Sequence, residues 1–163
     1  MMLSNEAAKR QELEKKQIQA AMAECQGHLN AMRGVQPAEA EKLKQRVVDT
    51  IKRYPKLPMD FKQMANAKAR SYECFANMRA ADYALHEAMR MAQSHQMKES
   101  SKLIGEARGF FRKAMSLGAD KEFQAAAERK IENVLMTGGI LPKGPTVAKP
   151  VFHTPKNPHC AKA

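Results

Sequence analysis

Residues 100–136, SSKLIGEARGFFRKAMSLGADKEFQAAAERKIENVLM, decide the fold that the sequence predicts. Apolar side chains recur there at steps of three and four residues, as on one face of an α-helix. A hydroxyl of Ser100 or Ser101 is expected to cap a first helix, and Gly118 to end it. Asp120 is expected to cap a second helix. Neither helix can bury its apolar face alone, so the two should form an antiparallel hairpin packed against further helices.

The rest of the chain has the composition of an all-α protein. Proline is absent from residues 1–36 and from residues 59–141, and these blocks are rich in Ala, Lys, Glu, Gln and Met. No segment alternates apolar and polar residues as a half-buried strand would. We therefore predict an antiparallel helical bundle, or stacked helical hairpins, of about five helices. Upstream of the hairpin, the expected helices cover residues 4–33, 38–53 and 59–94.

Residues 1–139 are predicted to form a single helical domain. The segment YPKLP, residues 54–58, interrupts it, because two prolines three apart cannot lie inside a regular helix. We interpret this segment as a connector between two halves of the domain and as its candidate hinge. Residues 140–163 hold five of the eight prolines, four lysines and no acidic residue, which favours a flexible tail.

Three features of the sequence predict how the helices pack. Residues 59–94 have a seam of mostly small side chains that would let another helix approach closely, although the sequence leaves open whether residues 60–94 form one helix or two. Gly105 and Gly109 share one face of a helix, which predicts close helix–helix contact there. Residues 9–17, KRQELEKKQ, are mostly charged and should project past the core as a solvated helix, with partner docking or a coiled coil as the alternative. The seam comprises Met64, Ala67, Ser71, Cys74, Met78, Ala81, Leu85, Ala88 and Ala92.

Within the hairpin, Ala107, Phe111, Ala114 and Leu117 have the spacing A-x3-F-x2-A-x2-L. This spacing resembles the second helix of a tetratricopeptide-type repeat. The resemblance covers residues 107–117 only, and Ala119 stands where the family has a helix-ending proline. It implies stacked helices and, through the family, binding of a peptide or protein.

No motif in the sequence indicates catalysis, so we expect no enzyme activity. The histidines lack the four-residue helical spacing of a metal site, and no glycine-rich phosphate loop is present, so no metal and no cofactor are expected. The three cysteines lie far apart in the sequence, and no two of them form a CxxC motif. No apolar run reaches the roughly 20 residues that cross a bilayer. Together these features favour a cytoplasmic protein without a membrane span.

The leading functional hypothesis is a non-enzymatic helical scaffold or adaptor that binds a protein or peptide. Five aromatic side chains are the candidate anchors of its binding groove: Phe61, Tyr72, Phe75, Phe110 and Phe111. The formal net charge of +11 supports an alternative, a protein that binds nucleic acid or another anionic surface. Its candidate basic surface comprises Lys42, Lys44, Arg46, Lys52, Arg53, Arg108, Arg112 and Lys113. A structural subunit of a larger assembly is a third alternative, and the sequence leaves the oligomeric state and the partner open.

Overall fold

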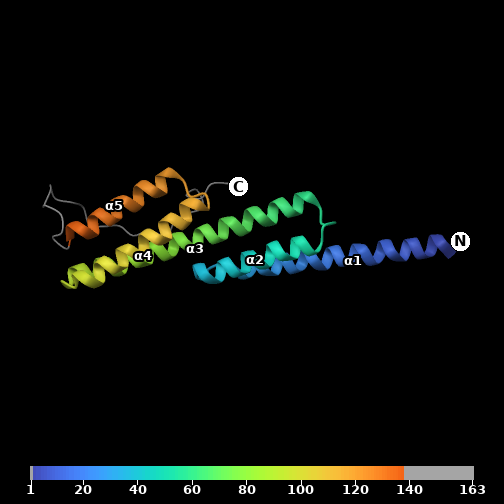
Figure 1. Ribbon diagram of the computed structural model, residues 1–163, viewed down its shortest axis with the longest axis horizontal. Coiled ribbons are helices and arrows are strands. Elements are labelled where there is room, and N and C mark those ends of the chain that lie inside the picture. Colours follow the sequence, from blue (N-terminus) through green and yellow to red (C-terminus); the bar gives the residue numbers. More distant parts are fainter. Residues whose placement is uncertain (1, 138–163) are drawn as a thin grey trace. The chain divides into compact units, whose positions relative to one another are not determined.

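The computed structural model describes residues 2–137, which form five α-helices without a strand among them (Figure 1). The predicted all-α class is therefore confirmed. Residues 59–93 form one helix rather than two. The predicted tail of residues 140–163 lies outside the described residues. The helices are α1 (Met2–Ala31), α2 (Pro37–Arg53), α3 (Met59–Gln93), α4 (Met97–Ser116) and α5 (Lys121–Thr137).

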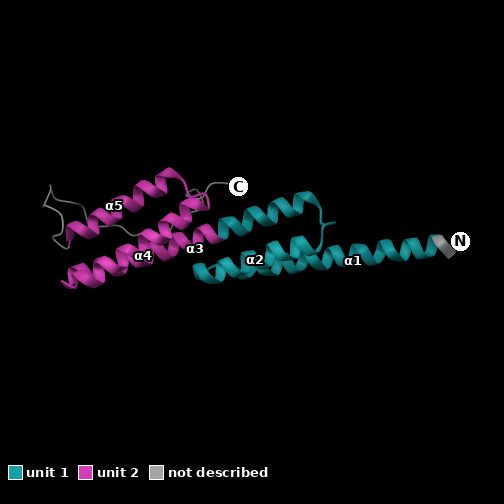
Figure 2. Cartoon of the chain, viewed as in Figure 1, with its two compact units in different colours: residues 1–72 teal, residues 73–163 magenta. Residues whose placement is uncertain are grey.

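The chain divides into two compact units, residues 1–72 (unit 1) and 73–163 (unit 2), coloured separately in Figure 2. The boundary falls inside α3, so this helix contributes its first part to unit 1 and its second part to unit 2. The boundary between the two units therefore does not fall at the connector of residues 54–58. That residues 1–139 behave as a single domain stays a prediction.

Unit 1 is built on an antiparallel hairpin of α1 and α2. Pro37 is the first residue of α2, where its fixed φ suits the helix and its missing N–H costs nothing. In the connector, residues 54–58, Leu57 is buried, with 3% of its surface exposed. The remaining buried apolar residues are Ala21, Cys25 and Leu29 of α1, Met32 in the turn after α1, Ala40, Leu43 and Val47 of α2, and Ala65 and Ala69 of α3.

The N-terminal half of α1 extends past the part of the helix that packs on α2 (Figure 1). Every side chain of residues 4–13 is exposed, and from residue 4 onward the first buried residue of α1 is Ala21. We call residues 4–13 the α1 arm. The expectation that the charged residues of this region project from the core agrees with this exposure.

In unit 2, the second part of α3 packs closely against α4. The Ser100 hydroxyl donates a hydrogen bond to the Ala88 carbonyl at 2.9 Å, and the Cys74 thiol lies 3.5 Å from the Ala114 carbonyl. Ser100 is fully buried between the two helices. The prediction that Ser100 or Ser101 caps this helix is wrong, because α4 begins earlier, after Gln96, without a side-chain cap. The α4–α5 hairpin is joined by Phe111 and Phe123, whose rings meet edge to face at 5.4 Å.

Two charged residues of α3 are buried in unit 2, and each has a cationic partner. The Lys130 ammonium of α5 donates to the Asp82 carboxylate at 2.7 Å, and only 15% and 11% of the two side chains are exposed. Lys113 of α4 lies 3.8 Å from the carboxylate of Glu73. Because a buried charge is costly when unpaired, these contacts fix how α4 and α5 face α3.

The ends of α3 and α4 share one hydrogen-bonding pattern, the Schellman motif. At the end of α4, Gly118 has φ of 107°, and the N–H groups of Gly118 and Ala119 donate to the Met115 and Ala114 carbonyls. At the end of α3, His95 takes the same left-handed position with φ of 60°. The predicted cap of α5 is confirmed, since the Asp120 carboxylate accepts a hydrogen bond from the Phe123 N–H at 2.9 Å.

The prediction of close helix contact at Gly105 and Gly109 is wrong. Both glycines are exposed, and a Cβ atom added at either would meet no atom within 4 Å. α4 instead buries the face that carries Ile104, Ala107 and Phe111. The two glycines therefore lower the helix stability of α4 without a packing gain in the described structure.

We expect His95→Gly to raise the free energy of unfolding by about 1 kcal/mol, because glycine avoids the steric cost of a left-handed Cβ. Urea denaturation followed by circular dichroism measures this change. Gly118→Ala is the matched control and should lower stability by a similar amount. A destabilised His95→Gly protein would contradict the assignment of strain to this residue.

Gly105→Ala and Gly109→Ala should each raise the free energy of unfolding by about 0.5–1 kcal/mol, since alanine has the higher helix propensity and finds open space. Thermal melting of each single variant tests this. Lower melting temperatures in both variants would show that these positions are packed.

Candidate partner-binding surfaces

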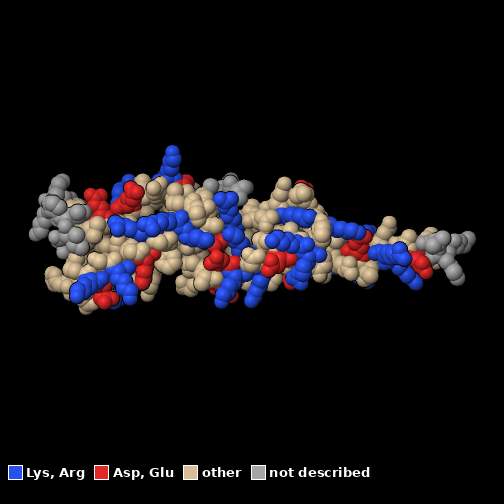
Figure 3. Space-filling view, in the orientation of Figure 1, with Lys and Arg blue, Asp and Glu red and all other residues tan. Residues whose placement is uncertain are grey.

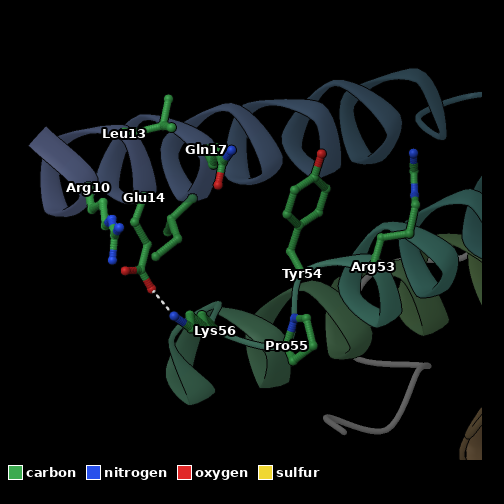
Figure 4. Close-up of a pocket in the computed structure, with 9 residues that line it drawn as sticks. Arg10, Leu13, Glu14, Gln17, Arg53, Tyr54, Pro55 and Lys56 are labelled. Carbon is green, nitrogen blue, oxygen red and sulfur yellow. Dashed lines mark ion pairs between the residues drawn. The ribbon is translucent and has the colours of Figure 1, made fainter.

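A cleft of about 550 Å³ lies in unit 1 between α1 and the connector that follows α2. α1 supplies Arg10, Glu14 and Gln17 on the side that faces the connector, and the Tyr54 ring projects from the connector toward α1 (Figure 4). We call this space the arm cleft, because the last residues of the α1 arm form its outer end. Its lining residues are Arg10, Leu13, Glu14, Gln17, Ile18, Arg53, Tyr54, Pro55 and Lys56.

The connector side of the arm cleft is held in place by several contacts. Leu57 is buried, and its N–H donates to the Tyr54 carbonyl at 3.1 Å. The Lys62 ammonium of α3 donates to the Pro55 carbonyl at 2.6 Å. The Lys56 ammonium lies 2.6 Å from the Glu14 carboxylate, which ties the connector to α1 across the cleft (Figure 4). The cleft is therefore formed before any ligand binds.

Two large apolar side chains of unit 1 are strongly exposed, and one of them lines the arm cleft. Leu13 lines it and is 58% exposed, and Met59, at the start of α3, is 63% exposed. Ile18 and Tyr54 are half-buried in its wall. When a partner covers large apolar side chains that are exposed to this degree, their burial from water favours binding.

The charges of the arm cleft are predominantly positive. Arg10, Arg53 and Lys56 line it, against the single carboxylate of Glu14. Arg53 also pairs with Glu24 at 3.2 Å, yet 60% of its side chain stays exposed. No ion pair of Arg10 lies among residues 2–137. Residues 2–72 as a whole contain 14 Lys and Arg against eight Asp and Glu.

A second, polar cleft of about 480 Å³ lies between α1 and α2. Glu24 and His28 of α1 and Arg46, Asp49 and Arg53 of α2 line it, and the His28 ring nitrogen lies 3.7 Å from the Glu24 carboxylate. Charges of both signs are thus balanced within this cleft.

The predicted basic residues lie on two helices, one in each unit. On α2, Lys44 is half-buried while Lys42, Arg46, Lys52 and Arg53 are exposed. On α4, Arg108, Arg112 and Lys113 are exposed, although Lys113 pairs with Glu73. Figure 3 shows Lys and Arg side chains spread over the visible face with acidic side chains among them, rather than gathered into one patch.

The predicted aromatic anchors contribute mainly to packing. Phe111 belongs to the core of unit 2, and Phe75 and Phe110 pack against that core while remaining partly exposed. In unit 1, Phe61 is half-buried. The Tyr72 ring lies 5.8 Å beneath the Arg33 guanidinium, which also donates to its hydroxyl at 3.4 Å. None of these five rings lines either cleft described above.

Sequence reasoning missed the arm cleft. Its residues come from two segments about forty positions apart that each look ordinary, a charged helix and a proline-containing connector. The available signals were the lone apolar Leu13 within KRQELEKKQ and the aromatic Tyr54 beside Pro55.

The described residues offer neither a metal-binding cluster nor a membrane-spanning helix. Residues 2–137 contain no group of three or more His, Cys, Asp and Glu side chains that could hold a metal ion. In the same part of the chain, every helix is too short or too polar to cross a membrane.

Burial raises the pKa of the Cys25 thiol, and the neighbouring Glu24 carboxylate adds to this rise, while Arg53 opposes it. The folded state therefore holds the thiol proton more tightly than the unfolded chain does. Stability from this source is complete below the ordinary thiol pKa and is lost as pH rises through the folded pKa.

Between about pH 7.5 and about pH 10, wild type should lose more stability than Cys25→Ala, which lacks the titrating thiol. Urea denaturation of both proteins at the two pH values gives this difference. Equal losses would show that Cys25 does not titrate differently in the folded and unfolded states.

We compared the chain with protein-family models, with curated proteins and with solved structures, and found no match in any of the three. The resemblance of residues 107–117 to a tetratricopeptide-type helix therefore stays a prediction.

Proposed function

We propose that this protein is a non-enzymatic helical adaptor that binds a protein partner through unit 1. The observation that carries the proposal is the α1 arm, in which ten consecutive helical residues, 4–13, are all exposed. The arm continues a packed helix and therefore needs no nucleation step of its own, so it presents an ordered helical surface that a partner can cover. A partner that covers the arm would stabilise it and bury Leu13.

The position of the arm supports this function. The arm ends beside a preformed cleft, and Met59 provides a second exposed apolar side chain at the start of α3. Preformed clefts bordered by apolar side chains bind partners with little ordering cost. The proposal takes the cytoplasm as the setting, and the free thiols of Cys25 and Cys74 are consistent with a reducing compartment.

Binding of nucleic acid or another anionic surface is the second candidate function. The exposed face of α4 favours it, since Lys98, Lys102, Arg108 and Arg112 are all exposed on one helix. The mixture of acidic and basic side chains in Figure 3 favours the adaptor. The captured molecule separates the two functions: the adaptor captures a protein, whereas the second function captures nucleic acid, whose binding weakens steeply as salt concentration rises.

Removing residues 2–13 should abolish partner binding while leaving the fold intact, because none of residues 4–20 is buried. Full-length protein and this variant are used for affinity capture from the native cell, and captured proteins are identified by mass spectrometry at low and high salt. We expect at least one protein to be captured by the full-length chain and not by the truncated variant.

Thermal melting is the control for this experiment, and the two proteins should melt within about 2 °C of each other. Identical sets of captured proteins would argue against the α1 arm as the binding element. Capture of nucleic acid alone, released by salt, would favour the second candidate function. Sedimentation of the isolated chain tests the third alternative, a subunit that assembles with copies of itself.

A further inference from the structure

We propose that the arm cleft binds an acidic peptide segment that carries one bulky apolar anchor residue. This inference rests on the proposed adaptor function and names the chemistry of its partner. Three observations support it: the size of the cleft, its apolar wall and its excess of positive charge.

The size of the cleft suits side chains rather than a folded domain or a duplex. Its volume of about 550 Å³ falls in the range of pockets that enclose small ligands, about 300–1,000 Å³. Such a space accepts one large apolar side chain and part of the peptide backbone beside it. The rest of the peptide would lie along α1 or the connector.

The wall provides an apolar contact for the anchor residue. Leu13, Ile18, Tyr54 and Pro55 line the cleft, and the Tyr54 ring projects toward α1 (Figure 4). The buried Leu57 and the bond from Lys62 to the Pro55 carbonyl hold the connector in this conformation. Because the wall is already ordered, little conformational entropy is lost when the anchor enters.

Charge complementarity selects an acidic segment. Glu14 is engaged by Lys56, whereas Arg10 has no ion pair among the described residues. Arg53 and Lys56 pair with Glu24 and Glu14 yet keep 60% and 73% of their side chains exposed, so both add positive charge at the surface of the cleft. The positive excess of unit 1 would attract such a segment and would repel a second copy of this chain.

Peptide selection tests the proposal without knowledge of the natural partner. A displayed library of random 12-residue peptides is selected on immobilised full-length protein, with counter-selection on the double variant Arg10→Glu, Leu13→Asp. Enriched peptides should be acidic and should share one aromatic or large aliphatic residue. Failure to enrich any peptide over the counter-selection, or enrichment of basic peptides, would overturn the proposal.

Single variants then locate the binding site by fluorescence anisotropy with the best selected peptide. Arg10→Glu and Leu13→Asp should each weaken binding roughly tenfold or more. Lys68→Glu and Tyr83→Asp are the matched controls, because they make the same charge changes at exposed positions of α3 that lie outside the α1 arm and line neither cleft. These controls should change the dissociation constant by about twofold or less. Equal effects of lining and control variants would show non-specific attraction and sink the proposal.

Two further measurements address the other occupants. Tighter binding of single-stranded DNA than of any selected peptide, weakened by Arg10→Glu, would assign the cleft to nucleic acid. A dimer in sedimentation that Leu13→Asp dissociates would assign it to a second copy of the chain. If capture of a cellular protein requires residues 2–13 but withstands Arg10→Glu and Leu13→Asp, the adaptor function stands and the acidic-peptide proposal fails.

Discussion

Close approach of α3 and α4 is the constraint on which the arrangement of unit 2 depends. A side chain of each helix reaches a backbone carbonyl of the other, Ser100 to Ala88 and Cys74 to Ala114. Such contacts need small residues where the helices face each other, and Ala81, Ala88 and Ala92 of α3 are all buried there. A larger side chain at these positions would displace α4, and with it Phe111, whose ring positions α5 through Phe123.

The sequence was sufficient to predict the helices and several of their ends, because periodicity, Pro37, Gly118 and Asp120 act locally. The sequence was insufficient to predict which face of a helix is buried, because that depends on the neighbouring helices. In the second part of α3 the predicted seam is buried, whereas in the first part Ala65 and Ala69 are buried and the seam residues are half-exposed. A straight helix drifts by about 20° per heptad from a strict seven-residue repeat, so one seam cannot face the core along all of α3.

The sequence indicated which types of residue could bind a partner, but not where the structure places them. Composition identifies basic and aromatic residues, but a buried Phe111 and a groove-lining phenylalanine have the same helical spacing. The arm cleft depends on how residues 54–57 turn back beneath α1, a conformation fixed by buried Leu57 and by Lys62. Arg10 and Leu13 acquire a role only once that turn exists, which is why the charged stretch around them looked like an ordinary solvated helix.

The continuity of α3 across both units has a consequence for how the chain folds. Starting a helix fixes several backbone angles for a single hydrogen bond, an equilibrium penalty of about a thousandfold, or roughly 4 kcal/mol. The unit that folds first forms its share of α3, and the other share can then elongate from an existing helical end without a second nucleation step. The two cores are thus coupled through the peptide backbone, and residues near the boundary at Tyr72 and Glu73 become the point where folding passes from one unit to the next.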